Sequence, residues 1–205
     1  MHKIKPICYT IFILALFLNC QKNTEQELSK AKQLFSEGNF SMAVPILEEI
    51  TKQDENNGDA WNMLGIAFYE MKNFEQSISY FNKAIKINNQ NYKYFYNRAN
   101  AQRELKLLLE AVEDYGQALT LEKNVADIYF NRAVVLMSLN RKKEAIADFE
   151  ACLQLDSKFG RAYFGLASAQ ISLNQSVSTE NCQHLQKALD LGYMEAKEAI
   201  DLYCK

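Results

Sequence analysis

The sequence predicts an all-α fold, an α-solenoid built from stacked pairs of antiparallel helices. The stretch YFYNRA (94–99) returns almost unchanged as IYFNRA (128–133), and 128 − 94 gives a period of 34. A period between about 20 and 50 residues is typical of stacked-repeat proteins. Only two prolines and seven glycines interrupt the 205 residues, which favours helix over strand. Large and small residues also recur in fixed columns at this period.

The first twenty residues are expected to direct the chain to an export pathway. Lys3 and Lys5 precede an apolar run from Ile7 to Leu18, which is too short to span a bilayer and has the pattern of a secretory signal. The run ends at Cys20, and this junction resembles the lipobox of bacterial lipoproteins. The resemblance implies a signal peptide over 1–20, a lipid on Cys20 that holds the chain to a membrane, and a polar tether over 21–23.

Two alternatives to lipidation remain open at this junction. The family prefers leucine and a small residue where this chain has Phe17 and Asn19, so the segment is also compatible with an uncleaved anchor or with ordinary signal-peptidase cleavage. No aspartate follows Cys20 directly, which favours the outer membrane if the species has one. We expect a location in the bacterial cell envelope, facing the periplasm or the cell surface.

The columns of the repeat become clear when the chain is cut at this period, starting from Thr24. The fourth position is aromatic in the later units, with Trp61, Phe95, Tyr129 and Tyr163. The eighth position is small, with Ala31, Gly65, Ala99, Ala133 and Ala167, and the twenty-fourth is large, with Leu47, Phe81, Tyr115 and Phe149. Small side chains let two helix axes approach, and large side chains fill the space beside them. Each period therefore predicts one pair of packed helices.

These columns resemble tetratricopeptide repeats, with AWNMLGIAFYEMKNFEQSISYFNKAI (Ala60–Ile85) as the closest copy. The resemblance implies an array over 24–193, divided into 24–57, 58–91, 92–125, 126–159 and a degenerate 160–193. The spacing of Thr24 and Glu27 predicts a capping box at the first helix. The proline that commonly closes each unit is replaced by Asn89, Lys123 and Ser157.

The C-terminal residues are expected to cap the stack. Helical periodicity breaks at Gly192 and resumes afterwards, which predicts a capping helix over 194–205. Cys182 and Cys204 would lie nearly level on two helices that turn at Gly192, so a disulfide or two buried thiols are both compatible with the pattern. Cys152 replaces an alanine of its column and is interpreted as a small core residue.

The resemblance also implies a binding surface, because the first helix of each tetratricopeptide pair lines a concave groove. Its groove positions fall on aromatic, amide and charged residues that suit an extended peptide or a partner helix. They include Asn62, Tyr69, Tyr96, Asn97, Asn100, Arg103, Phe130, Asn131, Met137 and Phe164. Val134 and Arg161 also occupy groove positions.

Two of these residues, Asn97 and Asn131, lie one period apart at the same position of neighbouring units. They resemble the asparagine ladder by which some tetratricopeptide arrays hold a peptide backbone, since an amide both donates and accepts. The favoured interpretation is simpler: the N-R-A triplet is common in this repeat, and Arg98 and Arg132 tie helices together.

No catalytic cluster is visible, so the chain is not expected to be an enzyme. The two histidines, His2 and His184, lie apart, and no phosphate-binding loop, H-E-x-x-H or close cysteine pair occurs. We therefore expect no cofactor, no metal and no small-molecule substrate. The acidic pair Glu113-Asp114 is interpreted as a solvated face. After position 20 the chain carries 21 basic and 25 acidic residues, or −4, without a basic stripe, which argues against nucleic acid.

Two functions of different classes fit this sequence. The first is an envelope lipoprotein that serves as an adaptor or scaffold and binds other proteins in its groove. The second is a permanent structural subunit of an outer-membrane or secretion assembly complex. Solubility distinguishes them, because a permanent subunit exposes large apolar patches when it is isolated.

Overall fold

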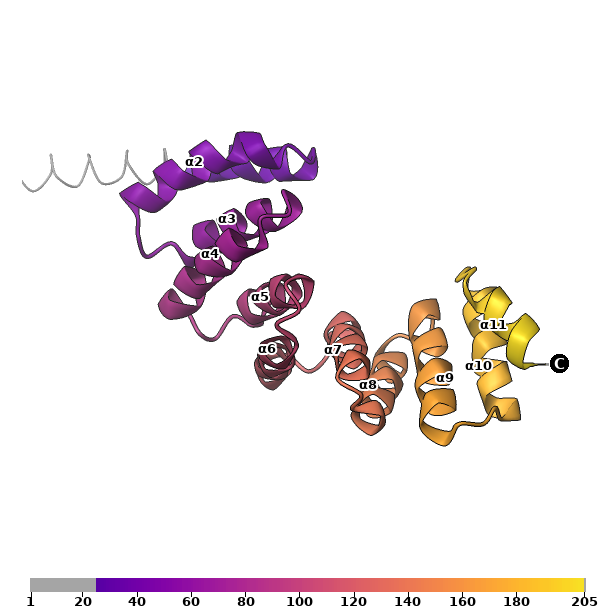
Figure 1. Ribbon diagram of the computed structural model, residues 1–205. Coiled ribbons are helices and arrows are strands. Elements are labelled where there is room, and N and C mark those ends of the chain that lie inside the picture. The colour runs from indigo at the N-terminus through magenta and orange to yellow at the C-terminus, as the bar shows by residue number, and fades with distance from the viewer. Residues whose placement is uncertain (1–24, 205) are drawn as a thin grey trace, which may run out of the picture. The chain divides into compact units, whose positions relative to one another are not determined.

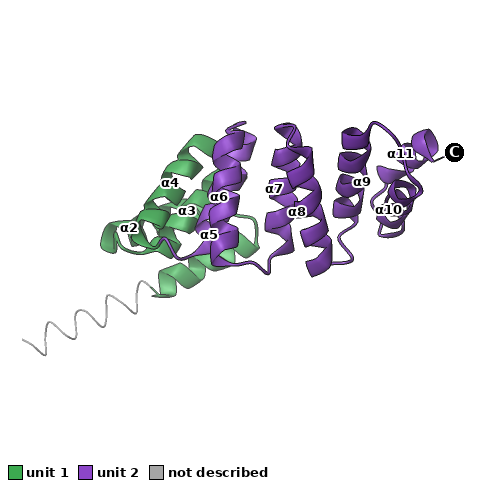
Figure 2. Cartoon of the chain, turned by 90° about the horizontal axis from the view of Figure 1, so that it is seen from below, with its two compact units in different colours: residues 1–88 green, residues 89–205 purple. Residues whose placement is uncertain are grey.

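The structure is a computed structural model that describes residues 25–204. The predicted signal peptide, the tether, Cys20 and Thr24 lie outside these residues. Every regular element within the described range is a helix, which confirms the predicted all-α class. The helices divide into two compact units, residues up to 88 and residues from 89 onward (Figure 2).

The first unit contains two helical pairs (Figure 1). Residues 25–36 are helical and are followed by α2 (Phe40–Gln53). The second pair consists of α3 (Gly58–Glu70) and α4 (Phe74–Ile87), and α3 packs against both α2 and α4. Asn57 and Asn73 cap α3 and α4, because each side chain accepts a hydrogen bond from a backbone N–H of the first turn.

The second unit contains three helical pairs and a final short helix. The pairs are α5 (Tyr92–Glu104) with α6 (Leu108–Leu121), α7 (Ala126–Ser138) with α8 (Lys142–Leu155), and α9 (Gly160–Asn174) with α10 (Thr179–Asp190). Each helix packs on the next in chain order, and α11 (Ala196–Tyr203) packs on α10. Small and large side chains form two core clusters along this stack, and the half-buried Val112 and Tyr129 pack against both.

The small and large columns meet where the two helices of a pair cross. In the first unit Gly65 of α3 lies against the ring of Phe81 of α4, which is 1% exposed. A Cβ atom at Gly65 would overlap Cε1 and Cδ1 of that ring. Ser77, also on α4, donates a hydrogen bond of 2.8 Å to the carbonyl of Gly65. The missing side chain is therefore what allows α3 and α4 to approach.

The turns between paired helices repeat at the same interval as the sequence. Gly38, Lys72, Lys106 and Asn140 have φ values of 74°, 62°, 62° and 59°, and each lies one repeat period after the previous one. Each lies in the left-handed region, which costs a residue with a Cβ about 1–2 kcal/mol. Glycine occupies only the first of these four turns. The fifth unit departs from the pattern, because its corresponding residue is Gln175, one residue late.

Partly buried ion pairs join the two helices of successive pairs in the second unit. Arg98 on α5 donates to both carboxylate oxygens of Asp114 on α6, at 2.6 and 2.7 Å. Arg132 on α7 makes the same two hydrogen bonds to Asp148 on α8, at 2.7 Å each. The bonds to Asp148 raise the pKa of the Arg132 guanidinium, which stays charged. The interpretation of Asp114 as part of a solvated face was wrong, because the residue is 5% exposed and its charge is paired.

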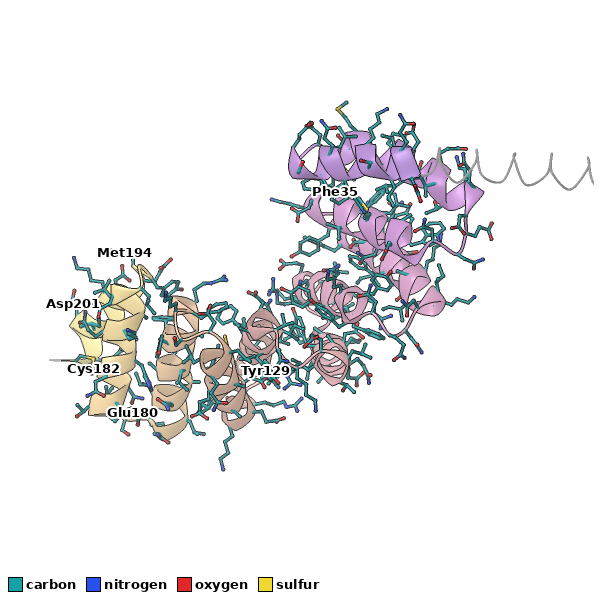
Figure 3. All side chains as sticks on the ribbon, turned by 180° about the vertical axis from the view of Figure 1, so that it is seen from behind. Phe35, Tyr129, Glu180, Cys182, Met194 and Asp201 are labelled. Atoms are coloured by element: carbon teal, nitrogen blue, oxygen red, sulfur yellow. A yellow bond between two sulfur atoms is a disulfide. The ribbon has the colours of Figure 1, made fainter. Side chains whose placement is uncertain are left out.

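The last pair and α11 are held by polar and covalent links. Ser178 and Asn181 form a reciprocal capping box at the start of α10. The chain turns at Gly192, whose φ is 87°, and Ala196 of α11 is buried. A disulfide joins Cys182 on α10 to Cys204, with the two Cα atoms 5.7 Å apart (Figure 3).

The remaining described cysteine, Cys152, is buried in the core of α7, α8 and α9 with a free thiol. Its exposed fraction is 0%. Burial raises the pKa of this thiol to about 12, and the nearby carboxylates Asp127 and Asp156 act in the same direction. The thiol therefore stays protonated and packs as a small apolar side chain.

Candidate protein-binding surface

The first helices of the second unit form one row. α5 contacts α7, and α7 contacts α9, although each pair is separated in sequence by a complete second helix. Side chains on these three helices and in the turns that adjoin α9 and α10 make two groups, one polar and one aromatic. We call the residues described in the next two paragraphs, together with Val134 on α7, the first-helix surface.

The polar group joins α5 to α7 through Asn131. The Asn131 side-chain amide donates to the hydroxyl of Tyr96 at 3.0 Å, and its oxygen accepts from Nη1 of Arg103 at 2.9 Å. Arg103 also donates to Glu104 at 2.9 Å. Because both functional ends of the amide are held by α5, Asn131 is fixed in orientation.

The aromatic group joins α7 to α9. The rings of Phe130 and Phe159 stack with their centroids 4.9 Å apart. The guanidinium carbon of Arg161 lies 4.8 Å from the Phe130 centroid and 5.3 Å from the Phe159 centroid, which is cation–π geometry. Further along α9, the ring of Phe164 packs against that of Tyr193, with the ring centroids 5.1 Å apart.

The other predicted site residues lie in different surroundings. Asn97 and Asn100 are half-buried on α5, and Asn100 accepts a 2.6 Å hydrogen bond from the hydroxyl of Tyr115. Met137 is also half-buried and packs on the core of α7, α8 and α9. In the first unit Asn62 is only 9% exposed, and the ring of Tyr69 packs edge-on against that of Phe74 at 5.4 Å.

The asparagine column cannot continue onto α9. Its next member is Gly165, since 131 + 34 = 165. The ring of Phe149 occupies the space where a side chain would stand, with its Cε1 and Cζ atoms each 2.5 Å from an ideal Cβ on Gly165. The asparagine column therefore ends at α7, and the buried ring of Phe149 fills the corresponding space at α9.

Sequence reasoning missed two members of the surface, Phe159 and Tyr193. Phe159 precedes α9 and falls at the last position of the fourth predicted repeat, outside the first-helix columns. Tyr193 follows Gly192 and falls at the last position of the fifth predicted repeat, one period after Phe159, since 159 + 34 = 193. The available signal was this shared column, which carries an aromatic residue in the last two repeats and not in the earlier ones.

Neither a metal cluster nor a membrane-spanning helix occurs in the described part of the chain. Among residues 25–204, no three side chains of histidine, cysteine, aspartate or glutamate gather in a way that suits a metal ion. Within the same range, no helix has the length and apolarity needed to cross a bilayer. His184 is half-buried on α10 and contacts the ring of Tyr163, with the ring centroids 5.8 Å apart.

Comparison with known structures identifies the same fold. A structure of MamA has a TM-score of 0.73 at 21% identity, over 82% of this chain and 96% of the other. A structure of YrrB, described as a TPR protein with an unusual peptide-binding site, has a TM-score of 0.73 at 19% identity. The match covers 85% of this chain and 90% of the other. A structure of PilF of Pseudomonas aeruginosa has a TM-score of 0.75 at 17% identity, and the match covers 84% of this chain and 78% of the other. Identities this low establish the fold alone.

Comparison with protein families gives a direct assignment. Models of the tetratricopeptide repeat match residues 58–91, 92–125 and 126–159, three consecutive units. No curated protein matches the sequence. Repeats of this family bind other proteins or peptides and generally serve as non-enzymatic scaffolds. The chain is a tetratricopeptide repeat protein.

Proposed function

We propose that this chain is a lipid-anchored scaffold of the bacterial cell envelope, and that its first-helix surface binds a peptide segment or a helix of another protein. The observation that carries the proposal is the fixed orientation of Asn131 on α7, the helix that also carries Phe130 of the Phe130–Phe159 stack. An oriented amide and aromatic rings carried by one helix offer hydrogen bonding to a backbone and apolar area to a side chain.

The chemistry of the surface indicates what its ligand presents. The amide of Asn131 retains a second N–H and a second lone pair for a peptide group after its bonds to α5. Arg161 is exposed and holds its guanidinium over two rings, so it suits a carboxylate or a backbone carbonyl beside an apolar side chain. We infer an extended segment with at least one apolar residue and one acceptor group.

Low ordering cost supports binding at this surface. Tyr96, Arg103 and Asn131 already constrain one another, so a ligand does not have to order three long polar side chains. Immobilising such a side chain on binding costs about 0.5–1.5 kcal/mol. Preorganisation of this kind raises affinity without adding contacts.

The anchoring part of the proposal rests on the sequence. A basic start, an apolar run and Cys20 at its end favour lipidation at the N-terminus of the mature chain. The described helix already includes residue 25, so no more than a few residues would separate Cys20 from the array and hold it close to a membrane. A partner should accordingly be an envelope protein.

Peptide display on the purified Cys20→Ser chain tests the binding surface. Random peptides are selected for binding, and each binder is then measured on Val134→Arg and on Glu150→Arg. Val134 is 37% exposed on α7, three residues after Asn131, while Glu150 is exposed on the second helix α8. We expect Val134→Arg to weaken binding about tenfold or more and Glu150→Arg to leave it unchanged, since the added side chain blocks only the first surface. Binders that tolerate Val134→Arg would show that the surface is wrongly assigned.

Metabolic labelling tests the anchor. Bacteria that produce the chain are grown with a clickable fatty acid, and label on the purified chain is compared with label on Cys20→Ser. The proposal requires label on the natural chain and its loss in the variant. An unlabelled natural chain, or label that persists in Cys20→Ser, would remove lipidation from the account.

A further inference from the structure

The first unit contains an open pocket that shares no residue with the first-helix surface. Its volume is about 630 Å³, and α2, α3, α4 and the turn between α2 and α3 all contribute to it. A pocket of this size falls in the range that binds small ligands or a few side chains. The lining residues are Thr51, Lys52, Glu55, Asn56, Trp61, Lys83, Lys86 and Ile87.

The pocket has an excess of positive charge. Three lysines and one glutamate line it, and 3 − 1 gives +2. The Nζ atom of Lys52 lies 3.9 Å from Oε2 of Glu49, and an ion pair this exposed holds its two charges together only weakly. Among residues 25–204, no carboxylate oxygen lies within ion-pair distance of Lys83 or Lys86. The arginine pairs of the second unit contrast with this arrangement, because each cation there has its own carboxylate.

Aromatic rings hold one of these lysines in place. The ammonium of Lys83 lies 4.0 Å from the ring centroid of Trp61 and 5.4 Å from that of Tyr80. Trp61 in turn stacks on Tyr80, with centroids 5.9 Å apart and an interplanar angle of 20°, and its indole N–H donates to the carbonyl of Glu55 at 3.0 Å. Lys83 is therefore a preorganised cation over an aromatic floor.

The same lining favours separate carboxylates over one compact, highly charged anion. Lys52 and Lys86 lie in the last turns of α2 and α4, where helix carbonyl ends carry partial negative charge. Glu55 adds a full negative charge. The three ammonium groups also lack the planar fork by which arginine binds phosphate bidentately. Single carboxylates spaced along a chain, with their apolar stems over Trp61 and Ile87, suit this pocket.

We propose that the pocket formed by α2, α3 and α4 binds an acidic peptide segment of a protein partner, with Lys83 and Lys86 pairing its carboxylates and Trp61 packing against their stems. This site adds a charge-selective contact to a protein of a binding family and does not depend on the first-helix surface.

Tryptophan fluorescence tests this site directly, because Trp61 is the only tryptophan of the chain. The Cys20→Ser chain is titrated with a short acetylated peptide of alternating glutamate and alanine, and with the same peptide carrying glutamine instead. We expect the glutamate peptide to change the Trp61 emission and the glutamine peptide to leave it unchanged. Binding should weaken as NaCl rises from about 50 to about 300 mM, since salt screens exposed charges.

Charge-removing variants locate the contact. Lys83→Gln and Lys86→Gln should each weaken binding of the glutamate peptide about two- to fivefold, the range for an exposed ion pair. Lys32→Gln is the matched control, because it removes an exposed lysine of the same unit that does not line the pocket. Equal binding of both peptides, or equal affinity in all three variants, would overturn the proposal.

Two further titrations separate the ligand class. Inorganic phosphate and phosphatidylglycerol vesicles present anions without a peptide. The proposal predicts that neither competes with the glutamate peptide at comparable charge concentration. A Trp61 response to phosphate or vesicles, with none to the peptide, would reject a peptide ligand and assign the pocket to a different anion.

Discussion

The substitution Asp148→Asn examines whether arginine–aspartate pairs hold the helices of each repeat together. The Asp148 side chain is 8% exposed and accepts two hydrogen bonds of 2.7 Å from Arg132, whose side chain is 25% exposed. Asparagine keeps the shape but removes the charge, so a partly buried guanidinium loses its counter-ion. Removing one partner of a fully buried pair costs about 3–5 kcal/mol.

Because a quarter of the Arg132 side chain reaches water, we expect a smaller loss of about 2–3 kcal/mol. A loss of this size lowers the melting temperature of a chain of this length by about 5–10 °C. Urea denaturation followed by circular dichroism gives the free energy of unfolding. Amide hydrogen exchange then assigns the loss to α7 and α8, since repeat arrays do not always unfold in one step.

Two controls decide the interpretation of this experiment. Glu150→Gln removes an exposed carboxylate from the same helix and should change stability by no more than about 0.5 kcal/mol. The double substitution of Arg132 and Asp148 by leucine should recover at least half of the loss, because it leaves no unpaired buried charge. The reasoning fails if Asp148→Asn behaves like Glu150→Gln.

Other substitutions and treatments have defined outcomes. Gly65→Ala should destabilise the chain by about 1–3 kcal/mol, because the added methyl overlaps a buried ring. Gly116→Ala should instead stabilise it by up to about 1 kcal/mol in thermal melts, because the added methyl would meet only Nη1 of Arg132, at 3.8 Å. Burial raises the pKa of the Cys152 thiol to about 12, so this thiol should resist alkylation in the folded chain, as measured by peptide mass spectrometry. Its contribution to stability should be complete below about pH 8.5 and should decline as the pH rises toward about 12. Reducing the Cys182–Cys204 disulfide, which spans 22 residues, should cost up to about 3 kcal/mol, seen as faster hydrogen exchange in α10 and α11.

The repeat period predicted most of the fold, because the residues that recur at this period are the ones that pack between helices. Gly65 and Phe81 occupy different columns, and the structure places the ring against the missing side chain. The left-handed turns at Lys72 and Lys106 were not predicted, because the usual signal is glycine and these positions carry lysine. There the packing of two helices imposes a conformation that local preference opposes.

The candidate sites were harder to predict, because they depend on which side chains meet across helices. Asp114 lies 16 residues from Arg98, so the periodicity of one helix does not mark the pair, although both residues recur one repeat period later as Asp148 and Arg132. The position of Lys83 over Trp61 depends in the same way on α3 and α4 packing together. Sequence columns assign a residue to a helix face, but partners come from three-dimensional structure.

The measurement that tests the central claim most directly is photocrosslinking in living bacteria from a benzophenone side chain placed at Val134, with Glu150 as the matched position on the second helix. The account predicts that Val134 captures one dominant envelope protein through a defined segment and that Glu150 captures none. Capture from Glu150 alone would contradict the claim and place the working surface on the second helices.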